Sequence, residues 1–308
     1  GIPFPVFHWR NRLKNTRNKN IQGYAFLSPF LILISLFYIA PSVLTIVMSF
    51  TSLDGAFIWE WDGFGNYLKI FKDPNTVIIL RNTVVYILVT MVLTIILDLF
   101  IAIMTTYFIK EEKWSSFFKS LIMIPMITPS VVYSVLWIWF LDASEAGFIN
   151  RILISVFKGA EPVNWIARYP FVVIIIAQLV VSLAYGSIIF SSAIKAIPDN
   201  QFKAAHVDGA SEWEIVKTII IPNISSHIRF IAMWETLGLM TNYINILLLT
   251  NGGPLNRTEV WALSAYHKAF VGQKYGYGAA ISVLLILVVF MIMLLFKATG
   301  GIGRRRGK

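Results

Sequence analysis

The chain has 308 residues, of which 57% are hydrophobic and only 14% are charged, whereas a soluble domain carries roughly a quarter charged residues. This composition indicates a membrane protein, so we attribute the net charge of +10 to membrane topology and expect no nucleic-acid partner. The absence of cysteine excludes disulfides, thiolate nucleophiles and thiolate metal sites. The few histidines lie outside the apolar runs, which argues against a histidine-based metal site or proton relay.

Several apolar runs reach or approach the roughly 20 residues that a helix needs to cross a bilayer. Backbone groups in lipid must pair within the segment, so we expect each run to be a helix. The predicted fold is therefore an all-α integral membrane protein with six transmembrane helices. The predicted spans are Tyr24–Phe50, Thr83–Ile109, Leu121–Leu141, Phe171–Ile194, Phe230–Thr250 and Gly278–Phe296.

Most lysines and arginines lie in the two tails, the second–third loop and the fourth–fifth loop. The positive-inside rule therefore predicts that both termini and these loops are cytoplasmic. The predicted organisation is a basic cytoplasmic tail over 1–23, one six-helix domain over 24–297 and a basic cytoplasmic tail over 298–308. The first apolar run exceeds the roughly 7–15 residues of a signal-peptide core, so we expect it to remain as an anchor.

The fourth–fifth loop contains signals for two short helices joined by a tight turn. Asp199 is expected to cap the first helix, and Gly209 suits the left-handed position that ends it. Ser211 and Glu214 have the spacing of a capping box for a second helix, which Pro222 is expected to end. The apolar face of this second helix is predicted to comprise Ile215, Val216, Ile219 and Ile220.

The loop over 198–222 resembles the EAA loop of permease subunits in binding-protein-dependent ABC importers. The matching positions are Pro198, Ala204, Ala205, Asp208, Gly209, Ala210 and Pro222. Other segments resemble carbohydrate-importer permeases of the MalF-like and UgpA-like type. They are Gly65–Tyr67, Asn82–Thr83, Leu249–Pro254 and Tyr275–Ser282.

This resemblance implies a coupling helix that contacts a cytoplasmic ATPase. The implied contact residues are Lys203, Ala204, Ala205, Asp208, Gly209, Ala210 and Glu214. Lys203 departs from the family, which usually has glutamate at that position. The implied partners are a second permease subunit in a heterodimer, two ATP-binding subunits and an extracellular solute-binding protein, in a bacterial-type cell membrane.

No enzymatic activity or bound cofactor is expected of this chain. Gly303–Lys308 ends superficially like a P-loop, but its glycine spacing is short and the final Ser or Thr is missing. ATP is therefore expected to be used by a partner subunit. An intramembrane enzyme is disfavoured because no paired catalytic residues or metal motif lie in the spans.

Polar residues in the fourth and fifth predicted spans are candidates for binding a sugar, whose hydroxyls suit amides, carboxylates and aromatic rings. Residues three, four or seven apart share a helix face. By resemblance to the maltose-type permease, four of the candidates fall at or near sugar-contacting positions: Ser182, Tyr185, Glu235 and Asn242. The other interpretation is hydrogen bonding between helices. The candidates are Gln178, Ser182, Tyr185, Glu235, Thr241, Asn242 and Asn245.

Two alternatives remain at this point. A stand-alone secondary transporter or channel would use carboxylates in the spans such as Asp98 and Glu235. A glycerol phosphate-type solute is also possible, although the predicted pore face carries a carboxylate and no Lys or Arg. Arg81 and Asp98 are roughly 25 Å apart along one helix and cannot pair with each other, so their roles are unassigned.

Overall fold

The computed structural model describes residues 24–305, with side chains as far as Ala298. The predicted tail over 1–23 and the side chains beyond Ala298 lie outside the described residues. All regular structure within 24–305 is helical, apart from an isolated bridge between Thr51 and Trp61, which confirms the all-α prediction. The helices are α2 (Ala40–Ser49), α3 (Gly65–Lys72), α4 (Asn75–Ile103), α5 (Glu112–Ile127), α6 (Ser130–Phe140), α7 (Phe148–Val156), α8 (Trp165–Arg168), α9 (Pro170–Lys195), α10 (Asp199–Val207), α11 (Glu212–Ile215), α12 (Ile221–Asn223), α13 (Ser225–Thr241), α14 (Ile244–Leu249), α15 (Trp261–Tyr266) and α16 (Tyr275–Arg305), with π-helical turns η1 (Ser35–Ile39), η2 (Met104–Phe108), η3 (Val216–Ile220) and η4 (His267–Val271).

Within the described residues, 4 helices are long and apolar enough to cross a membrane. The number rises to 5 if the bent pair of α5 and α6 counts as one span. The qualifying helices are Tyr24–Ser49, Asn75–Phe108, Pro170–Lys195 and Tyr275–Ala298. They correspond to the first, second, fourth and sixth predicted spans, so the prediction of six continuous helices is wrong for the third and the fifth.

The third predicted span bends by 98° between α5 and α6. Thr128 has an extended backbone (ψ 129°) because it precedes Pro129, and such a residue disfavours helix. The fifth predicted span also breaks. Its α13 has 17 residues and ends at Thr241, and the extended backbone of Asn242 (ψ 115°) separates it from α14.

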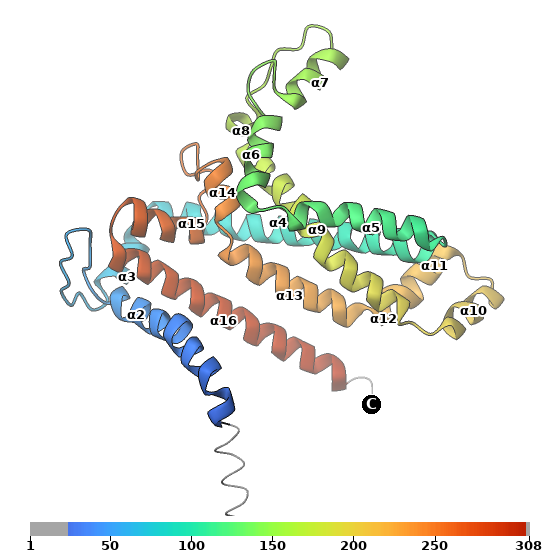
Figure 1. Cartoon of the computed structure of the whole chain (residues 1–308), viewed down its shortest axis with the longest axis horizontal. Coiled ribbons are helices and arrows are strands. Elements are labelled where there is room, and N and C mark those ends of the chain that lie inside the picture. Colours follow the sequence, from blue (N-terminus) through green and yellow to red (C-terminus); the bar gives the residue numbers. More distant parts are fainter. Residues whose placement is uncertain (1–23, 306–308) are drawn as a thin grey trace, which may run out of the picture.

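Figure 1 shows α4, α13 and α16 running side by side along the long axis of the molecule, and α5 packs against α9. The short helices α10, α11 and α12 gather at one end of this bundle, and α3 and α15 lie at the other. α6, α7 and α8 project sideways from the bundle. The bundle therefore has two distinct ends, one formed by the fourth–fifth loop and one formed by α3, α15 and their loops.

The closest helix pair is α4 and α9, which contact each other along much of their length. Small residues permit this approach, since Ala102, Ala177 and Ala184 are 0% exposed. In lipid, helices associate through such close packing and through polar contacts, because the hydrophobic effect does not drive them together. The α4–α9 interface is thus the natural place for buried polar groups.

Candidate functional site

A buried amide network joins α9 to α13 and α14. The Gln178 Oε1 atom accepts hydrogen bonds from Asn242 Nδ2 and from Asn245 Nδ2, both at 3.0 Å. The Gln178 Nε2 atom donates to Ser182 Oγ at 3.1 Å. The break between α13 and α14 places Asn242 and Asn245 against the same glutamine. Four of the residues predicted to share a site are therefore brought together.

Glu235 extends this network on α13. Its side chain is 7% exposed and lies near Ser182. α13 packs against both α4 and α9, so this buried carboxylate lies in the interior of the bundle.

The other two predicted site residues do not join the network. Tyr185 stacks on Trp234, with ring centroids 5.5 Å apart. Thr241 is exposed, and its hydroxyl donates to the carbonyls of Leu237 and Gly238 in its own helix. Within the described part of the chain, neither side chain forms a hydrogen bond with Gln178 or Glu235.

A second polar stripe runs along α4 and was missed in the sequence. Tyr86, Thr90, Thr94 and Asp98 follow one another at intervals of four residues and are at most 1% exposed. Their side-chain oxygens have no hydrogen-bond partner within the described part of the chain. The four-residue spacing was the signal that could have revealed a shared buried face. Carboxylate and hydroxyl groups of this kind inside spans usually mark a pathway or a polar helix contact.

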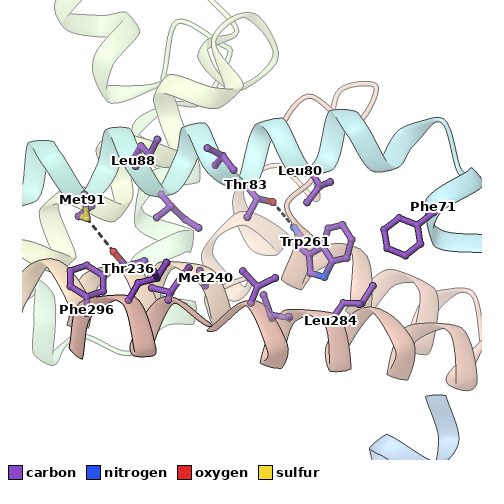
Figure 2. Close-up of a pocket in the computed structure, with 16 residues that line it drawn as sticks. Phe71, Leu80, Thr83, Leu88, Met91, Thr236, Met240, Trp261, Leu284 and Phe296 are labelled. Carbon is purple, nitrogen blue, oxygen red and sulfur yellow. Dashed lines mark hydrogen bonds between the residues drawn. The ribbon is translucent and has the colours of Figure 1, made fainter. Parts of the chain in front are cut away.

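An apolar pocket lies apart from these polar groups. It has a volume of about 570 Å³ and lies between α4, α13 and α16 (Figure 2). Its hydroxyls are already engaged: Thr83 Oγ1 accepts from the Trp261 backbone amide at 2.8 Å, and Thr236 Oγ1 lies 3.1 Å from Met91 Sδ. This cavity offers no free polar group to a sugar, so the amide network is the better candidate site.

The end of the bundle formed by the fourth–fifth loop has the helix–turn–helix structure predicted from the sequence. α10 ends before Gly209, whose φ is +79°, and Ser211 and Glu214 form both hydrogen bonds of a capping box. Two details differ. Asp199 is the first residue of α10 and makes no capping bond, because Pro198 occupies the cap position. Pro222 lies in the first turn of α12, where its missing N–H costs nothing, so it does not end the helical path.

The residues expected to contact an ATPase lie around this turn. Lys203, Ala204, Asp208 and Gly209 are exposed, as is Glu214, while Ala205 and Ala210 are half-buried. The opposite face of the second helix is buried against the bundle. Val216 and Ile220 are 3% and 0% exposed and pack with residues of α4 and α9, as the apolar pattern predicted.

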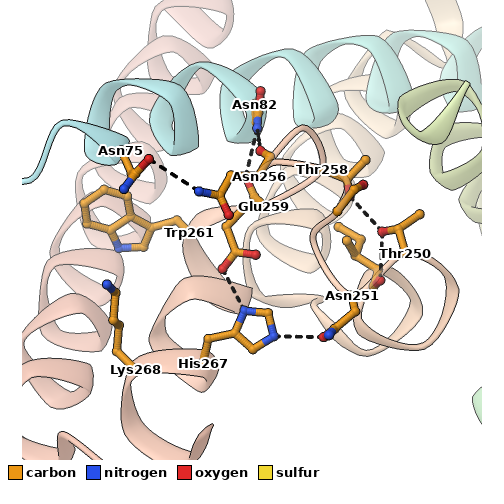
Figure 3. A network of polar contacts seen from close by, with 12 residues as sticks. Asn75, Asn82, Thr250, Asn251, Asn256, Thr258, Glu259, Trp261, His267 and Lys268 are labelled. Carbon is orange, nitrogen blue, oxygen red and sulfur yellow. Dashed lines mark hydrogen bonds and ion pairs between the residues drawn. The ribbon is translucent and has the colours of Figure 1, made fainter. Parts of the chain in front are cut away.

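The other end of the bundle holds a polar network that the sequence suggested only by resemblance. Asn82 Nδ2 donates to the backbone carbonyls of Asn256 at 2.8 Å and Glu259 at 3.1 Å (Figure 3). His267 lies between Glu259 Oε1 and Asn251 Oδ1, with both contacts at 3.0 Å. These bonds hold the loop after α14 against the start of α4. Burial raises the pKa of the Glu259 carboxyl, and the neighbouring His267 opposes that rise.

Comparisons with known proteins agree with this architecture. The profile of the family described as binding-protein-dependent transport system inner membrane component matches residues 98–299. A probable ABC transporter permease of Pyrococcus horikoshii is 30% identical over 272 residues, covering 87% of this chain and 92% of that protein. The lactose transport system permease LacF of Rhizobium radiobacter is 28% identical, covering 93% and 95% of the two chains.

Solved structures show the same fold. The chain matches one chain of a bacterial ABC transporter involved in the import of the acidic polysaccharide alginate, with a TM-score of 0.83 and 21% identity. The match covers 96% of this chain and all of the other. The family match spans the polar network, the fourth–fifth loop and α16. The chain therefore belongs to the binding-protein-dependent transport system inner membrane component family, the permease subunits of ABC transporters.

Proposed function

We propose that this chain forms part of the translocation pathway through which an ATP-driven importer passes a sugar or oligosaccharide. The observation that carries this proposal is the network of Gln178, Ser182, Asn242 and Asn245, which adjoins Glu235. Amides, hydroxyls and a carboxylate can exchange hydrogen bonds with sugar hydroxyls, as they exchange them with each other here. The relatives support the substrate class, since they include permeases named for lactose and for trehalose and maltose.

The charge of the buried residues bears on the alternative solutes. Buried charged residues in the described part of the chain are Asp98, Glu235 and Glu259, with no buried Lys or Arg. A phosphate group would need a cationic or N–H-rich site. We therefore favour a neutral sugar over a glycerol phosphate-type solute. Family membership decides against a stand-alone secondary transporter or channel.

Uptake measurements test this assignment. In cells that carry the complete transporter, Glu235→Ala and Asn242→Ala are expected to lower uptake of a labelled neutral oligosaccharide while the complex still assembles. Asp142→Ala, in an exposed turn, is the control and should leave uptake unchanged. A panel with glycerol phosphodiesters and uronate oligosaccharides identifies the solute class. Full uptake in both pathway variants would contradict the proposal.

The proposed topology has six membrane crossings with both termini in the cytoplasm. The bent α5–α6 pair and the broken α13–α14 pair would supply the third and fifth crossings. At about 1.5 Å per residue, the 17 residues of α13 extend roughly 26 Å, close to the thickness of a hydrocarbon core. The cysteine-free sequence suits a direct test. Cysteines at Lys203 and Glu161 should react with impermeant reagents from opposite sides; reaction from the same side would contradict the topology.

The proposed partners are a second permease, two ATP-binding subunits that use ATP, and an extracellular solute-binding protein. We assign α10, α11 and the turn between them, hereafter the elbow, to contact with the ATPase. The exposed small residues near the turn leave room for another protein surface. Lys203→Glu should weaken copurification of the ATPase if this position is used, whereas Lys158→Glu, far from the elbow in the chain, should not. Unchanged copurification of the ATPase would show that Lys203 does not contact it.

A further inference from the structure

Tyr107, at the end of α4, contacts both helices of the elbow. Tyr107 belongs to η2, the turn that continues α4. Its ring stacks on Phe202 of α10, with centroids 5.6 Å apart and an interplanar angle of 30°. Its hydroxyl donates to Glu212 Oε2 of α11 at 2.5 Å. A single residue of the second span therefore contacts both helices of the elbow.

Glu212 completes a three-way junction. While Oε2 accepts from Tyr107, Oε1 lies 3.5 Å from His206 Nε2 of α10. One carboxylate thus connects η2, α10 and α11. The hydrogen bond from Tyr107, followed by contributions from His206, holds the pKa of Glu212 below its usual range, so this group is ionised at neutral pH. The adjacent Phe108 packs against Trp213, with ring centroids 5.7 Å apart.

This junction matters because α10 has little other attachment to the bundle. None of its residues is buried. Its remaining contacts include a hydrogen bond of 3.1 Å between Asn223 Nδ2 and Gln201 Oε1. By contrast, the segment that continues α11 is anchored by Val216 and Ile220 in an apolar cluster with residues of α4 and α9. Besides the packing of Phe202 on that cluster, α10 is tied to the end of α4 by the Tyr107 ring and, through Glu212, by the Tyr107 hydroxyl.

The covalent connections of the elbow do not include α4. α10 follows α9 directly, and the chain after α11 leads through η3 and α12 into α13. A displacement of the elbow therefore reaches α9 and α13 through the backbone, but it reaches α4 only through side chains. α4 carries Asp98 and the hydroxyl stripe and packs on both α9 and α13. The polar groups of α4, α9 and α13 can therefore move as one unit only if α4 moves together with α9 and α13.

We propose that Tyr107 and Glu212 are positioning residues that make α4 move together with the elbow when the ATPase displaces it. This inference rests on the proposed role of the elbow as the ATPase contact. Without the junction, α4 would be coupled to the elbow only through its packing on α9 and α13 and would follow the elbow less closely. ATP hydrolysis would then continue with less solute transported for each ATP.

The test measures ATP hydrolysis and solute uptake together in proteoliposomes that contain the complete transporter. Tyr107→Phe removes only the hydroxyl and keeps the ring on Phe202; Glu212→Ala removes the carboxylate. We expect the ratio of solute transported to ATP hydrolysed to fall about fivefold in each, the change that one net hydrogen bond produces in an equilibrium. Tyr169→Phe and Glu145→Ala, both in the segments flanking α7 and α8, are matched controls and should keep the wild-type ratio.

The outcomes separate this inference from the proposed function. If the ATPase does not copurify with the wild-type chain through the elbow, the proposed coupling role fails. If it copurifies and both variants keep the wild-type ratio, only the junction is contradicted. If the variants do not assemble, the inference can still be tested by a distance measurement in a protein that keeps Tyr107 and Glu212. Spin labels at Ile109→Cys and Val207→Cys should keep the same separation with and without bound ATP, and a change in that separation would overturn the inference.

Discussion

The carboxylate of Asp98 on α4 lies directly against the backbone of Gly186 on α9. A β-carbon on residue 186 would overlap both Oδ2 and Cγ of Asp98. Asp98 is 0% exposed, and its two carboxylate oxygens have no hydrogen-bond partner within the described residues. Glycine at 186 is thus what allows a full carboxylate to fit between the two most closely packed helices.

Gly186→Ala is expected to destabilise the permease by about 1–3 kcal/mol, the usual cost of overpacking a filled interior. The same substitution in an Asp98→Ala background should cost much less, because the colliding carboxylate is gone. Thermal unfolding of the purified complex measures both. Gly238→Ala is the matched control, since nothing lies within 4 Å of a β-carbon there. Equal losses in both backgrounds would show that Asp98 and Gly186 are not in contact.

Gln178→Ala should destabilise the α9–α13–α14 junction. The amide groups of Asn242 and Asn245 would lose their shared acceptor, and each buried unsatisfied donor costs about 1–3 kcal/mol. Thr241→Ala serves as the comparison, because Thr241 is exposed and bonds only within its own helix. Denaturation of the two variants should rank Gln178→Ala as clearly less stable. A reversed ranking would mean that the amide network is not formed.

Ser211→Ala removes the cap of the second elbow helix and should cost about 1 kcal/mol of local stability. Its partner Glu214 has a pKa below the usual value, chiefly because it accepts from the Ser211 backbone amide. A carboxylate with a lowered folded pKa stabilises the structure above its unfolded pKa of 4.5, and this contribution is lost as the pH falls below that value. Hydrogen exchange of the α11 amides should quicken in the variant at neutral pH and in the wild type in acid.

His267→Ala should loosen the loop that follows α14. Glu259 is 6% exposed and would lose its nearest partner, at an expected cost of about 1–3 kcal/mol. Burial raises the pKa of Glu259, so the penalty should be present when the carboxyl is ionised and shrink as the pH falls towards 4.5. Proteolysis of the loop over 251–259 at several pH values measures this. If the loss of stability does not change with pH, it does not come from the unpaired Glu259 carboxylate.

Much of the helical arrangement could be predicted from local signals. Long apolar runs predicted the helices Asn75–Phe108 and Pro170–Lys195, because a segment that crosses a membrane must be apolar over its full length. The capping box of Ser211 and Glu214 and the turn at Gly209 were also predicted, since they depend on neighbouring residues alone. The bend at Pro129 was visible as a proline, but its angle depends on the packing of α6 against α14.

The candidate site was only partly predictable. Spacing placed Gln178 and Ser182 on one face of α9, but it could not show that Gln178 accepts from Asn242 at the break between α13 and α14. Tyr185 was expected beside them, yet its ring lies on Trp234. Side chains on one helix face point in somewhat different directions, and the packing of the neighbouring helices decides which of them meet.

By itself, the sequence determined the membrane character, the helical class, the family and the local structure of the elbow. Each of these follows from composition or from residues within a few positions of one another. Only the tertiary structure decided that Asp98 meets Gly186, that Glu259 meets His267 and that Tyr107 meets Glu212. The first and last of these pairs join residues 88 and 105 positions apart, and the middle pair depends on an irregular loop. Contacts of this kind are set by how helices pack, which no local pattern encodes.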